Sequence, residues 1–514
     1  MGKVAGIDLG TTFSAISILN DSGKPEIVKN QEGDYLTPSV VAFPSDQDGL
    51  VIVGEMANAH LEVEPDRVIK EVKRDMGTDK TYSLAGNEHT PQGISSMILK
   101  KLVQDAEKQV GKIDSAVVTV PANFREQARQ STMKAAEEAG INVEHIIDEP
   151  TAAALHYATS NKISGTVMIY DLGGGTFDVT IATIVGKDIK VITSAGSKNT
   201  GGTDIDKIIL EKIKKHYKEK FNSDLINTNN DRNEFYYTRE AEKIKKALSI
   251  KDKYKAPIKG NEGSLFVDFT RDEFENDIST LIADTEGLME EALDEAKDKG
   301  INENDIKNIL LVGGSTRIPA VSKLIKKKFN KDPLTGVNVD EAISLGAAIY
   351  AGKKADPTSL SATQQEELKK VDLEEVSNAY YGTIVVEVNQ EKQAYDNVVS
   401  IIIEKNTPLP CSKTESYFTI ADGQTEIKCE VTQSVAKETN PKFVDHIWNG
   451  VLDNLPPNRP AGQEIQVTYG YDENGMMNCK YKDVATGKEI TANLNMEAKG
   501  GSGAGPTAND FTIE

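Results

Sequence analysis

The sequence predicts a large α/β domain followed by a small all-β domain. Up to about residue 353, apolar strand patterns alternate with long helical patterns. From about residue 380, short strand patterns separated by turn residues take over. The length of 514 residues also exceeds what one hydrophobic core usually organises. We therefore divide the chain into an α/β domain (1–353), a polar linker (354–379), a β domain (380–498) and a flexible Gly-rich tail (499–514).

Periodicity and cap signals predict the elements of the first domain. Ala116–Val120 (AVVTV) is typical of a buried strand, and the Ala-rich helix after it stops near Gly140. A helix over residues 205–221 follows from its apolar positions, which gather near one face: Ile205, Ile208, Ile209, Ile213 and Tyr217. Thr270 and Glu273 form a capping-box pattern before one long helix over 271–297, and the strand NILLV (308–312) follows.

The β domain is predicted from its short strands and turns. The segments GTIVVEV (382–388) and NVVSIII (397–403) have the apolar, β-branched composition of strands. Asp422-Gly423 and Asn474-Gly475 are hairpin signals between later strands. No helical pattern of useful length interrupts this region.

Composition excludes several classes of function. Asp and Glu number 80 against 59 Lys and Arg, a net charge of -21, which disfavours binding to nucleic acid. No apolar run is long enough to span a membrane, and the first residues do not have the pattern of a signal peptide. Cys411, Cys429 and Cys479 lack metal-type spacing, so we expect ordinary thiols in a reducing cytoplasm.

One turn occurs twice. GIDLGTTFS begins at Gly6, and YDLGGGTFD spans 170–178. Each follows a short apolar strand and leads into another, so each predicts a strand–turn–strand hairpin rather than a Walker loop or a Rossmann fingerprint. Their glycines let backbone N–H groups approach an anion, whereas Asp8 and Asp171 would repel bare phosphate. The pair therefore predicts Mg²⁺ bound with a polyphosphate, and the alternative is two tight hairpins without a ligand.

Two further glycine turns fit the same site. GSKNTGGTDID (196–206) places Gly201 and Gly202 at a helix N-terminus, which suits a phosphate. VGGSTRIP (312–319) follows a strand, and its Gly313 and Gly314 would let a base or ribose lie against the backbone. Each of these turns, taken singly, is equally well explained as a plain loop.

These motifs resemble those of the DnaK-type heat-shock chaperones, which are built on the actin/hexokinase-like two-lobed ATPase fold. The segments that match, in the order of the family, are GIDLGTTFS, VPANFREQARQSTMKAAEEAG, IIDEPTAAAL, YDLGGGTFDVTI, GGTDID, VGGSTRIP and DEAISLGAAIYAG. Residues 405–433 and 460–489 resemble the peptide-binding β-sandwich of that family. The resemblance implies ATP hydrolysis to ADP with Mg²⁺ and binding of unfolded or extended polypeptides.

The resemblance assigns roles position by position. Asp8 and Asp171 hold Mg²⁺, Lys73 and Glu149 orient the attacking water, and Thr176 and Asp178 complete the catalytic group. The residues implied in ATP binding are Gly10, Thr11, Thr12, Gly173, Gly174, Gly175, Gly201, Gly202, Glu242, Lys245, Lys246, Ser249, Gly313, Gly314, Ser315, Arg317 and Asp340. Pro121 and Arg129 are the implied allosteric switch. Val386, Phe418, Ile427 and Cys429 fall where peptide-cleft or sandwich-core residues are expected, and the sequence leaves that choice open.

The chain departs from the family pattern in four places. Asp372 and Glu374 fall where the apolar interdomain linker has leucines, and buried carboxylates would be costly there. The helical lid is absent after the sandwich, residues 78–114 are shorter than in many members, and the strand near 382–388 aligns poorly. These departures bear on the coupling of the domains, on peptide release, on the nucleotide-exchange partner and on the peptide cleft.

Three hypotheses follow. The first is an ATP-dependent chaperone with a lidless peptide-binding domain, whose partners include clients and possibly a J-domain co-chaperone and a nucleotide-exchange factor. The second is an ATP-binding scaffold or co-chaperone with one dedicated partner and weak coupling between domains. A small-molecule kinase or filament-forming protein of the same fold is the third, and the β domain argues against it.

Overall fold

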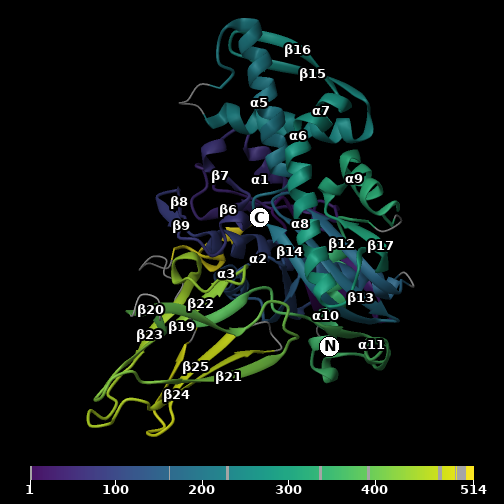
Figure 1. The fold of residues 1–514 in the computed structure, drawn as a ribbon. Coiled ribbons are helices and arrows are strands. Elements are labelled where there is room, and N and C mark those ends of the chain that lie inside the picture. Colours follow the sequence, from purple (N-terminus) through teal and green to yellow (C-terminus); the bar gives the residue numbers. More distant parts are fainter. Residues whose placement is uncertain are drawn as a thin grey trace.

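The computed structural model describes residues 3–160, 163–226, 231–334, 338–389, 394–472, 477–492, 494 and 505–514 (Figure 1). Two α/β lobes form the upper and central parts of the molecule, and a β domain lies below them. None of the helices in these ranges carries an apolar stretch long enough to cross a bilayer.

Lobe I is built on a sheet of order β11-β10-β1-β2-β3, with β4 pairing β2. β1 and β10 run parallel, as do β10 and β11, whereas β1, β2 and β3 form an antiparallel meander. The elements of this lobe are β1 (Lys3–Asp8), β2 (Phe13–Leu19), β3 (Pro25–Val28), β4 (Thr37–Pro38), β5 (Val40–Ala42), β6 (Leu50–Val53), α1 (Glu55–His60), η1 (Pro65–Arg67), β7 (Val68–Lys70), η2 (Val72–Asp75), β8 (Tyr82–Leu84), β9 (Asn87–His89), α2 (Pro91–Val110), β10 (Ile113–Val120), α3 (Glu126–Glu138), β11 (Val143–Asp148) and α4 (Glu149–Ser160).

Lobe II repeats this plan with a sheet of order β17-β12-β13-β14-β18. Its meander is β12, β13 and β14, with β17 parallel to β12. The elements are β12 (Gly165–Leu172), β13 (Phe177–Val185), β14 (Asp188–Ser197), α5 (Gly202–Phe221), α6 (Asp231–Ile250), β15 (Lys253–Gly260), β16 (Gly263–Thr270), α7 (Arg271–Asp277), α8 (Ser279–Asp298), η3 (Glu303–Asp305), β17 (Ile306–Val312), η4 (Gly314–Arg317), α9 (Pro319–Phe329), α10 (Ala342–Lys354), η5 (Pro357–Ser359), α11 (Ala362–Leu368) and β18 (Asp372–Glu374).

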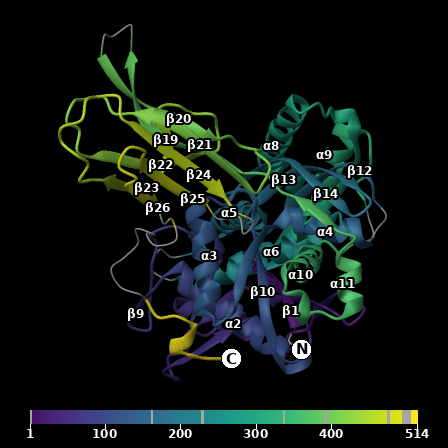
Figure 2. The same cartoon turned by 90° about the horizontal axis from the view of Figure 1, so that it is seen from below.

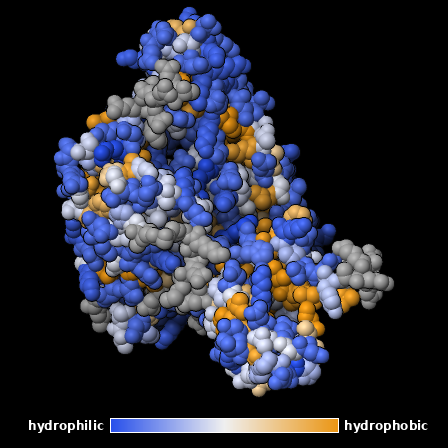
Figure 3. All heavy atoms as spheres, turned by 90° about the vertical axis from the view of Figure 1, so that its left-hand side faces the viewer, coloured by the Kyte–Doolittle hydropathy of each residue, from blue (hydrophilic) through white to orange (hydrophobic). Residues whose placement is uncertain are grey.

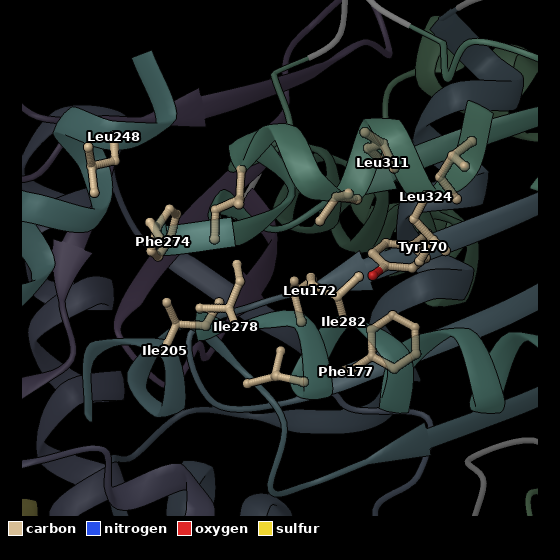
Figure 4. Packing of buried hydrophobic residues seen from close by; sticks show 14 of the residues in the cluster. Tyr170, Leu172, Phe177, Ile205, Leu248, Phe274, Ile278, Ile282, Leu311 and Leu324 are labelled. Carbon is tan, nitrogen blue, oxygen red and sulfur yellow. The ribbon is translucent and has the colours of Figure 1, made fainter. Parts of the chain in front are cut away.

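Helices α4 and α10 lie between the two sheets and share one apolar cluster with both of them. Their close approach depends on glycine, because a Cβ on Gly346 would lie 1.7 Å from the Ala152 carbonyl oxygen. Lobe I has its own core around α2 and β10, and lobe II has a core around β12, β13, α5 and α8. Figure 4 shows part of the lobe II core, with Leu172 and Phe177 inside it. The strands on both sides of the second glycine turn are therefore anchored in a packed interior.

The predicted elements of the first domain are found with one difference. The expected helix over 271–297 is divided into α7 and α8 at Ile278, whose φ of -92° and ψ of 2° are not helical. The Thr270 side chain accepts a hydrogen bond from the Glu273 backbone N–H, as the capping pattern predicts. Gly140, at the end of α3, has a φ of +77°.

The β domain consists of two stacked sheets of order β20-β19-β22-β23 and β21-β24-β25-β26 (Figure 2). Its strands are β19 (Tyr380–Asn389), β20 (Ala394–Ile403), β21 (Cys411–Phe418), β22 (Ile427–Ser434), β23 (Asp445–Leu452), β24 (Glu464–Tyr471), β25 (Met477–Asp483) and β26 (Glu489–Ala492), with η6 (Pro441–Phe443) between β22 and β23. Between the sheets lies an apolar core rich in tyrosine.

The two turn signals of this domain have different outcomes. Gly423 has a φ of +69° and makes a turn, but the strands on either side pair with different partners. The hairpin predicted at Asp422-Gly423 is therefore wrong, because the chain crosses from one sheet to the other at this turn. Asn474-Gly475 lies outside the described residues, and the strands that flank it, β24 and β25, are paired antiparallel.

The predicted linker is largely structured. Helix α11 packs on the lobes through Leu368, and Leu368 and the preceding Leu360 both belong to the central apolar cluster. Strand β18 pairs in parallel with β14 at the edge of the lobe II sheet. Val371 is buried and Leu373 packs partly against the same cluster, whereas the side chains of Asp372 and Glu374 face outward toward Lys353 and Lys190. The two carboxylates thus avoid burial because successive residues of a strand point to opposite faces.

The predicted flexible tail also differs. Residues 505–514 return to lobe I, where they form η7 (Ala508–Asp510) and β27 (Thr512–Ile513). Strand β27 pairs with β6 and completes a sheet of order β27-β6-β5-β7. In Figure 2 this yellow segment lies beside α2 and β9, away from the rest of the β domain.

The β domain is docked on both lobes. On lobe I, the Asn378 amide donates to the carbonyl oxygens of Ala122 and Phe124 at 3.0 and 2.8 Å, and Arg125 pairs with Asp445. On lobe II, Lys405 pairs with Glu295 of α8 at 2.7 Å. The side chain of Lys405 is 4% exposed, so this ion pair lies inside the interface rather than at its rim.

Candidate functional site

The two glycine turns face each other across the lobes. Asp8 lies at the end of β1 and Asp171 near the end of β12, each at the start of its turn. A Cβ on Gly174 would lie 1.9 Å from the Thr12 hydroxyl oxygen, and one on Gly175 would lie 2.6 Å from the Thr11 hydroxyl oxygen. Glycine is therefore required in the second turn, because any side chain there would push the lobes apart.

A cavity of about 570 Å³ opens between these turns. Its walls come from both lobes, and most of the site residues predicted from the sequence line it. These residues are Asp8, Gly10, Thr11, Thr12, Lys73, Glu149, Asp171, Gly173, Gly174, Thr176, Glu242, Lys245, Lys246, Ser249, Gly313, Gly314, Ser315, Arg317 and Asp340. Its size suits a ligand such as a nucleotide.

Gly175, Asp178, Gly201 and Gly202 are not among the lining residues. The backbone N–H of Gly202 donates to the Gly173 carbonyl oxygen at 3.0 Å, and a Cβ on Gly201 would lie 2.6 Å from the Gly174 carbonyl oxygen. The third turn thus packs directly on the second one. Its glycines shape the second glycine turn from behind, and the neighbouring Thr203 reaches the cavity.

One end of the cavity is rich in carboxylates. Asp8, Glu149 and Asp171 line it, and Asp178 is buried beside Asp171. Lys73, which is 4% exposed, pairs with Glu149. Burial, followed by the charge of Glu149, raises the pKa of Asp8 to about 7 and raises the pKa of Asp171 well above its usual range. The cluster therefore carries more potential negative charge than Lys73 alone neutralises.

Several buried polar atoms at this end have no hydrogen-bond partner among the described residues. They are the Thr12 and Thr203 hydroxyls and one carboxylate oxygen each of Asp171 and Asp178. Buried polar groups normally have partners, so these atoms are suited to a polar ligand. The described residues contain no group of three or more His, Cys, Asp or Glu close enough to hold an ion directly. A divalent cation that keeps most of its waters, as Mg²⁺ does, fits this donor set better than a fully protein-bound ion.

The other end of the cavity is formed by α6 and η4. Lys245 pairs with Asp206 at 2.8 Å and also donates to the Gly202 carbonyl oxygen at 3.0 Å. Arg317 pairs with Asp340 at 2.9 Å. Burial raises the pKa of Asp206 to about 6. Polar and charged side chains of α5, α6 and η4 thus line this end of the cavity together with Gly313 and Gly314, and such a surface can bind the polar groups of a ligand.

Sequence reasoning missed several residues in and beside this cavity, among them Phe13, Asp206 and Arg74. Phe13 lines the cavity, and the Lys246 ammonium lies 5.9 Å from the centre of its ring. Asp206 of α5 also lines the cavity. It is the last residue of the GGTDID motif, so its acidic side chain beside a glycine turn could have indicated a site residue. Arg74 donates to the Gly175 carbonyl oxygen at 2.9 Å and to Asp204 at 3.1 Å, which ties lobe I to the second turn. Arg74 follows Lys73 directly, and only its position beside that lysine could have drawn attention to it.

The predicted switch residues lie between the cavity and the β domain. Arg129 is buried in α3 and donates to the carboxylate of Asp148 at 2.5 Å. Asp148 directly precedes Glu149 of the cavity. The Arg129 Nε also donates to the Phe124 carbonyl oxygen at 3.1 Å, and the same oxygen accepts a hydrogen bond from Asn378. Pro121 lies at the end of β10, at the start of the turn to α3 that contacts Asn378.

The predicted peptide-site residues fall into two groups. Cys429 is fully buried in the sandwich core and Ile427 packs partly against that core, which favours the core alternative for both. Val386 is 40% exposed and Phe418 is 60% exposed. Val388 and Tyr395, which face each other in the β19–β20 hairpin, are also exposed and were not singled out. Figure 3 shows apolar side chains gathered on the lower part of this face, where the β domain lies.

The fold and the cavity together define a class of protein. Two similarly built α/β lobes enclose a carboxylate-lined cavity, and a strand at the edge of lobe II leads into a docked β-sandwich. A sequence model of the family described as Hsp70 protein matches residues 4–85 and 79–504. The chain therefore belongs to the Hsp70 family, and membership supports ATP-dependent chaperone function in general.

Proposed function

We propose that this protein hydrolyses ATP with Mg²⁺ and uses that reaction to control the binding of extended polypeptide segments by its β domain. One observation carries the proposal. Arg129 donates to Asp148, the neighbour of Glu149 in the cavity, and also to the Phe124 carbonyl oxygen, which accepts from Asn378 where the β domain is docked. A protein that only binds ATP to hold its shape has no need for such a buried connection.

The cavity residues suit phosphoryl transfer to water, which depends on positioning and on neutralising charge. Asp8 and Asp171 would hold Mg²⁺ through its waters. When bound, Mg²⁺ would neutralise phosphate charge. Lys73 would add a second positive charge, and the backbone N–H groups of both glycine turns would contact the phosphates.

The water that attacks the γ-phosphate needs a carboxylate to orient it and to accept its proton. Glu149 is suited to this role because Lys73 holds it at the carboxylate-rich end of the cavity. Asp171 and Asp178 would support the same water network, and the hydroxyl of Thr176 would contact the γ-phosphate. Burial, followed by the charge of Glu149, raises the pKa of Asp178 well above its usual range, and its Oδ1 accepts a hydrogen bond from the Asn123 backbone N–H at 3.2 Å.

The nucleoside would occupy the far end of the cavity. The side chains of α6, from Glu242 to Ser249, would face the adenosine on one side. Gly314, Arg317 and Asp340 would face it on the other side. Phe13 adds an apolar surface at the cavity wall.

The peptide would bind on the β domain by main-chain hydrogen bonds and apolar contacts, the usual mode for extended segments on a sheet. Val386 and Phe418 are exposed enough to contact it. Cys429 and Ile427 would support the sandwich beneath, and they would contact a peptide only if the domain opens. A J-domain co-chaperone and a nucleotide-exchange factor are the partners that family membership suggests.

The test is ATP turnover measured with and without a panel of unrelated extended apolar peptides. The expected result is stimulation by several peptides, and its loss in Arg129→Ala with nucleotide affinity unchanged. Asp171→Asn should abolish hydrolysis, and Asp272→Asn in the solvent-facing part of α7 serves as a matched control. Absence of any hydrolysis that depends on Asp171 would refute the enzymatic half of the proposal.

The second candidate is an ATP-binding scaffold or co-chaperone with a dedicated partner. The specific observation in its favour is that the β domain is held on both lobes and that residues 505–514 are bound back to lobe I. Limited proteolysis with and without ATP separates the two candidates. Identical cleavage of the β domain in both conditions would favour the scaffold.

A further inference from the structure

The last residues of the sequence form a strand on the edge of lobe I. Thr512 donates its backbone N–H to the Gly49 carbonyl oxygen at 3.0 Å, and Glu514 donates to Val51 at 3.0 Å. The Val53 N–H donates in return to the Glu514 carbonyl oxygen at 2.8 Å. Main-chain bonds of this kind are how an extended segment adds to the open edge of a sheet.

Side chains reinforce this strand. Ala508 is fully buried in the lobe I core, and its N–H donates to the Ser96 hydroxyl at 3.0 Å. The ring of Phe511 lies 5.8 Å from that of Phe43 and 6.0 Å from that of His89. Burial lowers the pKa of His89, so at neutral pH this ring presents an uncharged aromatic surface to Phe511.

The groove on lobe I is shaped for this segment. Lys100 of α2 donates to the Ala508 carbonyl oxygen at 2.9 Å, and the Asn509 amide donates to the Glu138 carbonyl oxygen at 2.9 Å. A Cβ on Gly93 would lie 2.7 Å from the Pro506 carbonyl oxygen, so a larger residue there would exclude the segment. Contacts from β6, α2 and α3 thus converge on one ten-residue stretch.

This stretch lies outside the Hsp70 match, which ends at residue 504. It is separated from the last described residue of the β domain, Leu494, by residues 495–504, which are rich in glycine. Ten residues, fully extended, span at most about 36 Å. The β domain is therefore connected to the lobes at both of its ends: it follows strand β18, which pairs with lobe II, and it leads to the segment 505–514, which pairs with lobe I.

We propose that residues 505–514 are a clasp that occupies a dedicated peptide groove on lobe I and restrains the β domain in its docked position. Release of the clasp then becomes a separate step that full movement of the β domain requires. A short tether keeps two joined parts at a high effective concentration, so the clasp stabilises the docked state even though it does not touch the docking surface itself. The inference rests on the contacts of the full chain and does not depend on ATP hydrolysis.

The experiment is hydrogen exchange on the full-length protein and on variants without a functional clasp. The variants are a deletion of 505–514, Ala508→Glu, which places a carboxylate in the lobe I core, and Phe511→Asp. The control is Phe266→Asp, because Phe266 is 68% exposed in lobe II. The readouts are the amide of Glu126, which is bonded to Gln433 of the β domain, and the amides of β18. Exchange at both places should become at least about tenfold faster in every clasp variant and stay unchanged in the control.

A second arm separates tethering from simple stabilisation of lobe I. A synthetic peptide with the sequence of residues 505–514 is added to the deletion variant, and its binding is followed at the Val53 amide. The peptide should protect Val53 and leave the exchange of Glu126 fast, because a separate peptide fills the groove without restraining the β domain. Full recovery of slow exchange at Glu126 would overturn the clasp and leave a structural role for the segment.

Two other results would also overturn the proposal. Unchanged exchange at Glu126 in the deletion variant would show that docking does not depend on the segment. If hydrogen exchange in the intact protein slows with rising protein concentration, the strand pairs between two copies of the chain rather than within one copy.

Discussion

The side-chain alternation of strand β18 can be tested with two substitutions of opposite kind. Leu373→Asp places a carboxylate on the face of the strand that packs on the central apolar cluster. Asp372→Leu places an apolar side chain on the outward face, where the Asp372 side chain is 80% exposed. The same two residue types are thus exchanged on opposite faces of one strand. We expect the first variant to undock the strand and the second to leave it docked.

The expected magnitude follows from burial. Leu373 is partly buried, so its loss costs about 1–2 kcal/mol of apolar stabilisation, and a carboxylate left without a partner in its place costs about 2 kcal/mol more. Together they shift the docking equilibrium by roughly a hundredfold or more, since each 1.4 kcal/mol is about tenfold. Asp372→Leu removes only an exposed ion pair with Lys353, which contributes less than about 1 kcal/mol.

Hydrogen exchange of β18 and of its partner residues 188–190 in β14 measures the outcome, with peptide-stimulated ATP turnover as a second readout. In Leu373→Asp, exchange should accelerate about a hundredfold and stimulation should disappear, whereas basal turnover stays within a few-fold. Equal exchange in the two variants would refute the reasoning, because it would show that the face on which a residue lies does not decide whether the linker docks.

Three further predictions concern the cavity and the interface. Glu149→Gln should lower ATP turnover at least about a hundredfold with ATP affinity retained, as measured by phosphate release and calorimetry, and turnover within threefold of the original would contradict its role. Gly174→Ala should weaken ATP binding at least about tenfold because its Cβ would lie 1.9 Å from the Thr12 hydroxyl, whereas Gly287→Ala, which meets nothing within 4 Å, should be neutral. Burial and the nearby charge of Asp148 raise the pKa of Glu375 to about 8 in the docked protein, so docking is strongest below its ordinary pKa of 4.5 and weakens as pH rises toward 8. Small-angle scattering from pH 5 to pH 9 should show this opening, and Glu375→Gln should remove the pH dependence; a radius of gyration that is constant in both proteins would contradict it.

The sequence predicts well which residues line the carboxylate-rich end of the cavity, because the information there is local. Asp8 and Asp171 each follow a short apolar strand and precede a glycine turn, so their place at the mouth of a hairpin is visible without any structure. The roles of Lys73 and Glu149 came only from the family resemblance. They lie 76 residues apart, in η2 and at the first residue of α4, and no local pattern encodes their ion pair.

Other features could not be predicted because they depend on which elements become neighbours. Gly201 and Gly202 look like phosphate contacts in the sequence, yet they pack on the second turn because helix α5 begins directly behind it. The alternation of apolar residues around Cys429 does not show which face of the strand is buried. Only the packing of the second sheet of the sandwich shows that Cys429 lies inside. The segment 505–514 carries little apolar periodicity, and its partners lie far earlier in the chain, 412 residues before Ala508 at Ser96 and 371 residues before Asn509 at Glu138.

The two faces of strand β18 explain how an acidic linker can dock on lobe II. A strand at the edge of a sheet needs apolar residues on one face only, so Val371 and Leu373 are enough to dock it, and the outward positions are free to carry charge. On this outward face Lys353 pairs with Asp372, and Lys190 pairs with Glu374. Lobe II therefore holds the β domain through β18, and lobe I holds it through β27. Because the cavity lies between the lobes, any change in the angle between them must alter the separation of these two attachments, and the β domain is the part of the molecule that has to respond.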